Sequence, residues 1–423
     1  MTASPPFRTT SPGIRTAKAA TVRQHLRQGR ETAFLDVRDA IEYAEGHAFG
    51  SVSVPLPALE RKIAALVPRL DAPIVLLGDT AGRDKRAAQA LAQLGYRDIT
   101  ILSGGLTAWS AAGGEVFWGT NVACKAFGAW VADVRSTPLI TAPDLKARID
   151  AGDDLVVIDV GPATEAGPLS IPGAVKVAAA EILYRLADLA PSPRTTIVTA
   201  SGGHARSIIM AQLLIDAGVP NPVAALQHGI IGWSLAGHPL AEARTQPPVS
   251  SAAVAAAQTQ ARRLADKAGV VTIDRTTLEQ WRRDDGRTLY EFDVRGGEEH
   301  RAGLIPGFRP LPSDRLLPLV DQQVGVAGAR LVLADLDGVR ALVTAAGLRQ
   351  MGWQDVVVLG TEHAHALGPL QAGTPDGAAN GTPAPAKGPT APPPAEAVAA
   401  YSAWEQQVIA QLRRDGLTRY RAL

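Results

Sequence analysis

The sequence predicts an α/β protein built from three tandem copies of one domain, and two repeated patterns carry this prediction. Three segments join a short apolar strand ending in Asp-Val to a polar loop and a small-residue turn; they begin at Phe34, Val157 and Glu291. A second block follows each as strand, loop, amphipathic helix and strand; these blocks begin at Ile74, Ile197 and Leu331. Continuous apolar strands alternating with helices are typical of a parallel sheet covered on both faces.

The boundaries of the copies follow from these repeats and from shifts in composition. We predict a flexible leader (1–13), a first domain (14–130), a second domain (135–245), a linker with a helix (246–269), a third domain with a shortened trailing block (270–362), a Pro/Ala/Gly linker (363–397) and a C-terminal helix (398–423). The Pro-rich segment is low in complexity, which is typical of a semi-extended linker.

Cap residues mark the ends of several helices. A helix opens each copy, with Thr21, Thr141 and Thr276 as predicted N-caps and Gly29, Gly152 and Gly286 as predicted stops. Ser250 and Ser251 are candidate caps of the helix between the second and third copies. The C-terminal helix places four apolar residues on one face, namely Ala400, Trp404, Val408 and Leu412. We expect it to dock on one of the domains, with binding to another subunit or protein partner as the alternative.

Composition excludes several classes of function. The chain has 423 residues and a formal net charge of +1, so no global field steers it to nucleic acid or an anionic membrane. It has no apolar run near the roughly 18 residues of a membrane span, and its first residues lack the apolar core of a secretory signal. The single cysteine, Cys124, excludes an intrachain disulfide and a multi-cysteine metal site. We expect a cytoplasmic bacterial protein with no metal, no cofactor and no nucleic-acid or membrane partner.

With these segments described, the repeat resembles the rhodanese family. "LDVRDAIEYAEGHAFGSVSVPL" resembles the leading motif of that family, and "LGYRDITILSGGLTAW" resembles its trailing Gly-Gly-x-x-x-Trp motif. The second copy matches with "IPGAV" and "GIIGWSLAGHPL", whereas the third stops at "GWQDVVVLG" without the trailing motif. The C-terminal "AYSAWEQQVIAQLRRDG" resembles the closing segment of members with a fourth domain, and the Pro-rich linker lies where that domain would be. The resemblance implies three rhodanese-like domains, each with a small central parallel sheet.

The resemblance also implies a sulfurtransferase chemistry. In the family, a cysteine at the end of a strand takes sulfane sulfur from thiosulfate or a persulfide and passes it to a thiophilic acceptor. That cysteine opens a six-residue loop that ends in Arg or Lys. A thiolate suits the task because a helix N-terminus lowers its pKa, and the loop amides hold the anionic persulfide.

The second copy has a loop of the right length but no cysteine. The loop is Ser201-Gly202-Gly203-His204-Ala205-Arg206, with Ser201 in the place of the cysteine. A serine hydroxyl without an adjacent base stays protonated at neutral pH, and it cannot form a persulfide. We expect the loop to bind an anion, with His204 as a possible donor. The tight loop disfavours His204 as a base for Ser201.

The other two loops lack the cysteine as well. The third copy has Asp335-Leu336-Asp337-Gly338-Val339-Arg340, and the Asp335 carboxylate would repel thiosulfate or fill the anion cradle itself. In the first copy two alignments stay open: a loop from Gly78 to Arg83, or one from Asp79 to Arg86, both containing Gly82. The position of the missing cysteine is therefore Ser201, Asp335, and Gly78 or Asp79.

The remaining candidate residues are read as structural. Cys124 lies far from any loop start and is expected to be a partly buried small residue, with a redox or sulfur-accepting thiol as the alternative. His47 is expected to shape the fold, since Leu304 takes its place in the third copy. His363 and His365 are too few for a metal site. The aspartates that end the first strands are expected to cap backbone amides; they are Asp36, Asp159 and Asp293.

Three functions follow, in order of preference. The first is a non-catalytic rhodanese-like protein, a pseudoenzyme of sulfur metabolism, whose loops bind thiosulfate, sulfate or another small oxyanion, or a protein partner. The second is an active sulfurtransferase that uses Cys124 or the thiol of a partner. The third is a hydrolytic or oxyanion-sensing use of the loop that contains Ser201, His204 and Arg206.

Overall fold

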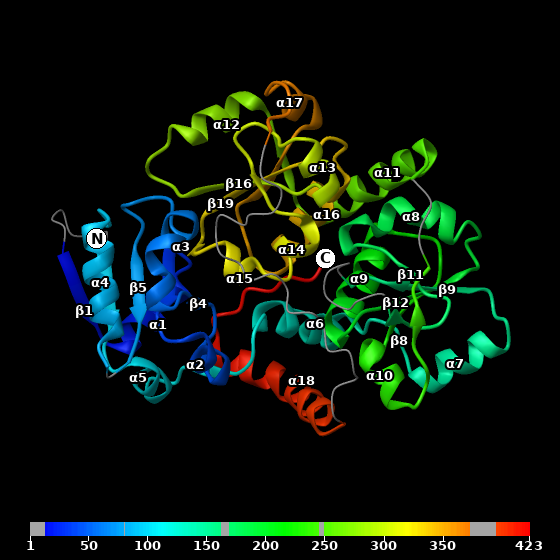
Figure 1. The fold of residues 1–423 in the computed structure, drawn as a ribbon, viewed down its shortest axis with the longest axis horizontal. Helices are drawn as coiled ribbons and strands as arrows, with labels where there is room; N and C mark the ends of the chain where they lie inside the picture. The colour runs from blue at the N-terminus through cyan, green and yellow to red at the C-terminus, as the bar shows by residue number, and fades with distance from the viewer. Residues whose placement is uncertain (1–12, 80, 162–168, 245–248, 373–394) are drawn as a thin grey trace.

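Three mainly parallel sheets that share one strand order surround a central helix, α6 (Val122–Arg135), in a computed structural model (Figure 1). The structure describes residues 13–79, 81–161, 169–244, 249–372 and 395–423. The first unit (residues 13–117) and the second unit (139–242) lie on opposite sides of α6 in this view, and the third unit (271–371) lies above them. Within the described segments, no helix is long and apolar enough to cross a membrane.

The first unit has a central sheet in the order β1 (Gly13–Ala17), β6 (Asp98–Leu102), β5 (Ile74–Leu77), β2 (Thr32–Asp36) and β4 (Val52–Ser53). All five residues of β2 are buried, as expected for a strand covered on both faces. Its helices are α1 (Ala19–Arg27), α2 (Ala40–Glu45), the 3-10 helix η1 (Leu56–Ala58), α3 (Leu59–Leu66), α4 (Arg83–Gln93) and α5 (Gly105–Ala111). A small separate ladder pairs β3 (His47–Ala48) with β7 (Val116–Phe117).

The second unit repeats this arrangement. Its sheet runs β8 (Leu139–Ile140), β13 (Val223–Leu226), β12 (Thr196–Ala200), β9 (Leu155–Asp159) and β11 (Val175–Lys176). Its helices are α7 (Ala142–Asp150), η2 (Ala179–Glu181), α8 (Ile182–Leu189), α9 (His204–Ala217) and α10 (Gly229–Leu235). The corresponding small ladder pairs β10 (Leu169–Ser170) with β14 (Ala241–Glu242).

The third unit has the same strand order and a different ending. Its sheet runs β15 (Val271–Ile273), β20 (Val356–Leu359), β19 (Arg330–Ala334), β16 (Leu289–Asp293) and β17 (Arg309–Pro310). Its helices are α12 (Arg275–Arg282), α13 (Gly297–Ala302), α14 (Ser313–Leu316), α15 (Val320–Gln323), α16 (Val339–Gln350) and α17 (Thr361–His365). Leu304 exchanges backbone hydrogen bonds with Gln371, so the chain packs on this unit beyond residue 362 and the predicted linker begins too early.

The predicted helix starts are confirmed in two places and wrong in two. The Thr141 hydroxyl accepts from the Asp144 N–H before α7, and Ser250 caps α11 (Ser251–Ala268) in the same way. Lys18, not Thr21, precedes α1, because the Thr21 N–H already bonds to the Lys18 carbonyl.

The third opening helix also starts earlier than predicted. The Asp274 carboxylate caps α12 by accepting from the Thr277 N–H at 2.7 Å, which places Thr276 inside the helix. The helix ends at Arg282, before the predicted stop at Gly286.

Helix α6 crosses the predicted boundary between the first and second domains. It packs against α9 so closely that a Cβ on Gly128 would lie 2.5 Å from the Cβ of Ala205. At its end, Arg135 forms an ion pair of 2.7 Å with Asp216. Although α6 follows the first unit in the sequence, it therefore covers the second.

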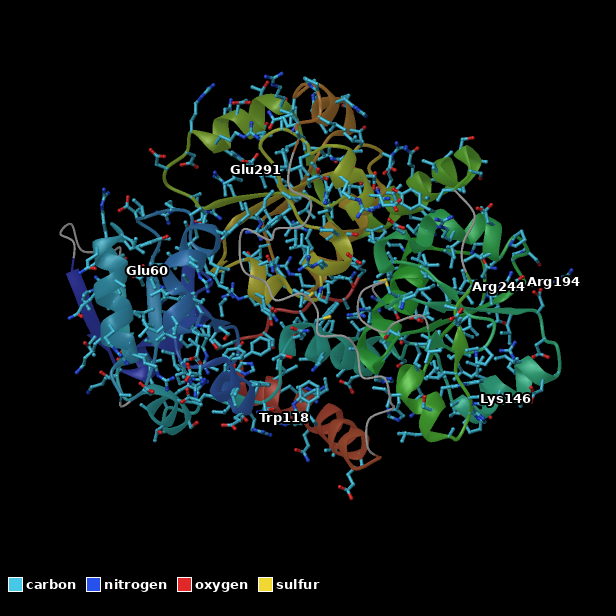
Figure 2. The ribbon with its side chains drawn as sticks, viewed as in Figure 1. Glu60, Trp118, Lys146, Arg194, Arg244 and Glu291 are labelled. Carbon is cyan, nitrogen blue, oxygen red and sulfur yellow. The ribbon has the colours of Figure 1, made fainter. Side chains whose placement is uncertain are left out.

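The C-terminal helix docks on the chain, as predicted, but it is shorter than predicted. Helix α18 spans Ala395–Asp415, and residues 416–423 continue as a non-helical tail. Trp404, Val408 and Leu412 are buried in a cluster with residues of α6 and β7, whereas Ala400 is exposed. Trp118, which follows β7, lies beside α18 in Figure 2, and its ring centroid is 5.9 Å from that of Trp404.

A strand from the third unit completes the sheet of the first. Strand β18 (Val326–Ala327) pairs antiparallel with β2, with Val326 opposite Ala33. The hydroxyl of Tyr290 bridges the same junction, because it donates to the Leu66 carbonyl and accepts from the Val326 N–H. The first and third units therefore share backbone hydrogen bonds. The predicted leader, except Gly13, and most of the predicted Pro/Ala/Gly linker lie outside the described residues.

Candidate anion-binding loops

Each unit carries one loop at the carboxyl end of a central strand, before a long helix. These loops join β5 to α4, β12 to α9 and β19 to α16. Ligand sites of open α/β sheets commonly lie at this edge. The first residue after the strand is Gly78, Ser201 or Asp335, so the strand ends favour Gly78 over Asp79 in the first copy.

The second loop is open toward its glycines. A Cβ built on Gly202 or Gly203 would meet no heavy atom within 4 Å. Ser201 is only 1% exposed, and its hydroxyl donates to the Gly203 carbonyl at 2.6 Å and lies 3.1 Å from the Ser207 hydroxyl. Ser201 therefore forms the base of the loop and is not presented as a nucleophile.

His204 is a neutral hydrogen-bond donor and does not act on Ser201. The His228 backbone N–H donates to His204 Nδ1 at 3.0 Å, so the proton of the neutral ring is on Nε2. Burial, with a smaller contribution from His228, lowers the pKa of His204 to about 4. Because Nδ1 is occupied and the Ser201 proton goes to Gly203, the alternative of a Ser201–His204 pair is not supported.

A second histidine lies next to the first. The ring centroids of His204 and His228 are 5.4 Å apart. His228 has φ of 58°, which is a left-handed conformation; Gly104 adopts the same conformation at the equivalent position of the first unit. His228 was not predicted as a site residue. The sequence did contain a clue, because a histidine stands where the trailing motif has the first glycine of Gly-Gly.

The structure brings Arg206 next to Cys124, away from the expected roles of both. Arg206 and Cys124 line a cavity of about 20 Å³ together with Ser313 of the third unit. Cys124 lies on α6 in the main apolar cluster and is 7% exposed. The thiol is therefore a packed residue at the junction of the second and third units.

The third loop is filled by its own carboxylate. Asp335 is fully buried and accepts from the Gly338 N–H at 2.6 Å and from the Ala341 N–H at 2.9 Å. Burial, reinforced by the nearby Asp337, raises the pKa of Asp335 to about 6. The carboxylate takes the place that an anion would occupy at this helix N-terminus.

The rest of the third loop is bound to the second unit. Tyr184 donates to the Asp337 carboxylate at 2.7 Å, and Arg340 pairs with Glu181 at 3.0 Å and with Glu299 at 3.0 Å. Residues that resemble a catalytic loop thus form an interface between the second and third units.

The first loop has no room for a side chain at its start. A Cβ on Gly78 would lie 2.5 Å from the Cβ of Asp84, which lies in the first turn of α4. Arg83 pairs with Glu42 at 2.6 Å and also contacts Asp79. The arginine expected at the end of the loop is neutralised by these carboxylates.

Acidic strand ends organise the neighbouring loops. Asp36 and Asp293 each accept a backbone N–H two residues later, at 3.1 and 3.2 Å, as predicted. Each also pairs with an arginine at 2.6 Å, namely Arg38 and Arg295. The sequence reasoning missed these pairs, although the spacing Asp-Val-Arg was visible. Among the described residues, the Asp159 carboxylate accepts a hydrogen bond only from the Gly161 N–H, at 2.9 Å.

The other histidines that the sequence singled out have structural contacts. His47 is buried, stacks on Tyr43 at 3.9 Å and contacts the Tyr43 carbonyl through Nδ1 at 2.9 Å. His365 lies 3.2 Å from the Leu336 carbonyl, and His363 lies 3.6 Å from Glu362. In the part of the chain that the structure describes, no group of three or more metal-ligating side chains occurs.

Comparisons with known proteins agree with this geometry. The model of the rhodanese-like domain matches residues 18–112 and 141–236, within the first and second units. The crystal structure of a thiosulfate sulfurtransferase from Pseudomonas aeruginosa has a TM-score of 0.87 and 33% identity, covering 97% of this chain and 100% of that one.

Two shorter matches were also found. The uncharacterized protein YqhL of Bacillus subtilis is 33% identical over 87 residues, which are 21% of this chain and 65% of that protein. The chain thus spans less than two thirds of this curated relative. A structure of the Alr3790 protein from Anabaena sp. is 30% identical, covers 25% of this chain and 84% of that one, and has a TM-score of 0.23.

The fold and the strand–loop–helix sites define an α/β protein of the sulfurtransferase type. The chain belongs to the rhodanese family, as a homologue whose two matched units, and the third unit of equal strand order, lack a cysteine at the start of the loop.

Proposed function

We propose that this rhodanese-family protein is non-catalytic and that its second loop binds a small oxyanion such as thiosulfate or sulfate. The observation that carries the proposal is the residue at the start of each loop. Gly78, Ser201 and Asp335 cannot carry sulfur, and Cys124, the single cysteine of the sequence, is buried on α6. The cytoplasmic location expected from the sequence belongs to the same proposal.

The second loop is the best candidate among the three. Asp335 fills the third loop and Asp84 blocks the first, whereas Gly202 and Gly203 face open space. The 14-residue helix α9 begins here and favours negative charge at its N-terminus. His204 adds a donor, because no described residue accepts from its Nε2–H and its side chain is nine-tenths buried.

The choice of anion rests on the relative from Pseudomonas aeruginosa. That protein is named a thiosulfate sulfurtransferase, and this chain is similar to it over its whole length. A site that has lost the sulfur carrier and kept the loop retains the hydrogen-bond donors for the anion. We therefore place thiosulfate first and sulfate second as ligands.

The first experiment measures sulfur transfer from thiosulfate to cyanide. We expect no turnover above background for the native chain or for Cys124→Ser. Turnover that Cys124→Ser abolishes would replace the proposal with catalysis through this thiol. Turnover that persists in Cys124→Ser would require chemistry without cysteine and would equally overturn it.

The second experiment tests the loop by titration calorimetry with thiosulfate and with sulfate. Gly202→Glu places a carboxylate at the open side of the loop, and Gly202→Gln is the matched neutral control, since both side chains have space there. We expect Glu to weaken binding about tenfold or more through charge repulsion, and Gln to change it less. Equal anion affinity in Gly202→Glu and Gly202→Gln would mean that the anion binds outside the second loop.

A further inference from the structure

A cavity of about 800 Å³ lies where the first unit, the third unit and the C-terminal tail meet. Thr32 and Asp98 open strands β2 and β6 at its wall, and Arg287 and Asp355 precede strands β16 and β20. The cavity is therefore at the amino ends of the strands, on the opposite edge from the loops. Its volume is in the range of sites that take drug-sized ligands.

The tail forms one wall and is firmly held. In Figure 1 it runs from α18 between the first unit and α15. The Arg419 guanidinium donates to the Arg27 carbonyl at 2.9 Å, and a Cβ on Gly29 would lie 1.8 Å from it. The Tyr420 hydroxyl donates to the Ala123 carbonyl at 2.9 Å. The wall that faces the cavity is thus preorganised.

One part of the cavity is apolar. Apolar side chains from three segments line it, namely Phe49, Val52, Val320, Val324, Leu417 and Tyr420. These residues come from the first unit, the third unit and the tail, so an apolar body bound here would contact all three. Burial of apolar surface stabilises such a complex by about 25 cal/mol per Å².

The charges at the wall leave cations without acidic partners. Glu31 pairs with Arg69 at 2.7 Å and with Arg287 at 3.0 Å. The other paired acids are Asp71 with Arg97, Asp98 with Arg15, and Asp355 with Arg287.

Two arginines and one acid remain outside these pairs. Among the described residues, no carboxylate lies within ion-pair distance of Arg30 or Arg419. Burial raises the pKa of Asp321 to about 6, so this carboxylate is still mostly ionised at pH 7 and offsets one of the two arginines. One arginine remains in excess at the wall.

We propose that this cavity binds an amphipathic organic anion, with its carboxylate, sulfonate or phosphate near Arg30 and Arg419 and its apolar body against Phe49, Val320 and Tyr420. The site is separate from the second loop and does not depend on its function. The charged group satisfies cations that lack an acidic partner, and the apolar body fills a preformed cavity, which limits the entropy lost on binding.

The test uses 1-anilinonaphthalene-8-sulfonate as a fluorescent probe of the full chain, with decanoate and decylammonium as competitors. We expect saturable binding of one probe per chain, displacement by decanoate, and at least tenfold weaker displacement by decylammonium. Equal displacement by the two competitors would overturn the assignment of charge.

Two pairs of variants locate the site. Ala327 lies opposite Thr32 on the side of the cavity, so Ala327→Trp should fill the space and reduce probe affinity at least tenfold, while Ala327→Ser should not. Arg30→Glu should weaken binding about five- to tenfold, and Arg30→Gln less. Thermal unfolding verifies that each variant is folded. Unchanged affinity in a folded Ala327→Trp would overturn the proposal, and Gly202→Glu should leave probe binding unchanged.

Discussion

The guanidinium of Arg23 donates to the carboxylate of Asp415 at 3.1 Å and to its backbone carbonyl at 3.0 Å, and so joins the first helix of the chain to the last. Both residues are almost fully buried, at 3% and 0% exposure. The same carboxylate accepts from the Glu115 N–H at 3.0 Å. This buried ion pair is therefore one of the contacts that hold the two ends of the described chain together.

Removal of one partner of this pair should be strongly destabilising. In Arg23→Met the buried Asp415 loses its cation, which costs about 3–5 kcal/mol of unfolding free energy. The measurement is chemical denaturation of the native chain, each single variant and the double variant with Asp415→Asn. We expect the double variant to lose clearly less unfolding free energy than the two single variants lose in total. Additive effects would mean that the two side chains are not coupled.

The buried carboxylate in the third loop should make stability depend on pH. The pKa of Asp335 is about 6 in the folded protein and about 4 in an unfolded chain. Between these values the folded state keeps a proton that the unfolded state releases, so the contribution of Asp335 to stability falls as the pH rises from about 4 to about 6. The unfolding free energy of the native chain minus that of Asp335→Asn should fall over this range and stay constant above it. A constant difference from pH 4 to pH 7 would contradict the raised pKa.

A thiol should restore the sulfur carrier in the second loop and not in the first. In a Cys124→Ser background, Ser201→Cys places a thiol at the base of the open loop, and thiosulfate should add one sulfur atom to the protein by mass spectrometry. Gly78→Cys should stay unmodified and lose stability, because its Cβ would collide with Asp84. A folded Ser201→Cys that forms no persulfide would show that the second loop has lost more than its nucleophile.

The junction of the first and third units should depend on one hydroxyl. Tyr290→Phe leaves the Val326 N–H without its acceptor, which costs about 1–3 kcal/mol for a buried group. The Leu66 carbonyl keeps the N–H of Gly325 at 3.1 Å, so the loss is confined to one group. Denaturation measures the cost, and Tyr96→Phe is a control inside the first unit, where the Tyr96 hydroxyl donates to the Val67 carbonyl at 2.7 Å. An equal effect of the two substitutions would argue against a special role of the junction.

Much of the fold could be predicted because its signals are local and repeated. The three strand–loop–helix blocks gave the parallel sheets, and the caps at Thr141 and Ser250 follow from residue type. The predicted start of α12 was wrong because Asp274 and Thr276 are both good N-caps, and residue preference alone cannot decide between two nearby positions.

The candidate site likewise has features that the local sequence predicts and features that it does not. The loop lengths and the missing cysteines are properties of the sequence. The position of Arg206 beside Cys124 and the contact of Arg340 with Glu181 depend on packing between elements far apart in the chain. The filling of the first loop by Asp84 depends on the exact path of the loop from β5 to α4. The cavity behind the sheets could not be predicted, since its walls are formed by many segments from the first unit, the third unit and the C-terminal tail.

The pairing of β18 with β2 bears on how the protein is made. A ribosome releases residue 33 long before residue 326, and domains generally begin to fold from the N-terminus during synthesis. For that interval the edge of β2 at Thr32 and Ala33 has no partner strand, and an open sheet edge is a template for association with other chains. This edge is closed only when the third unit emerges.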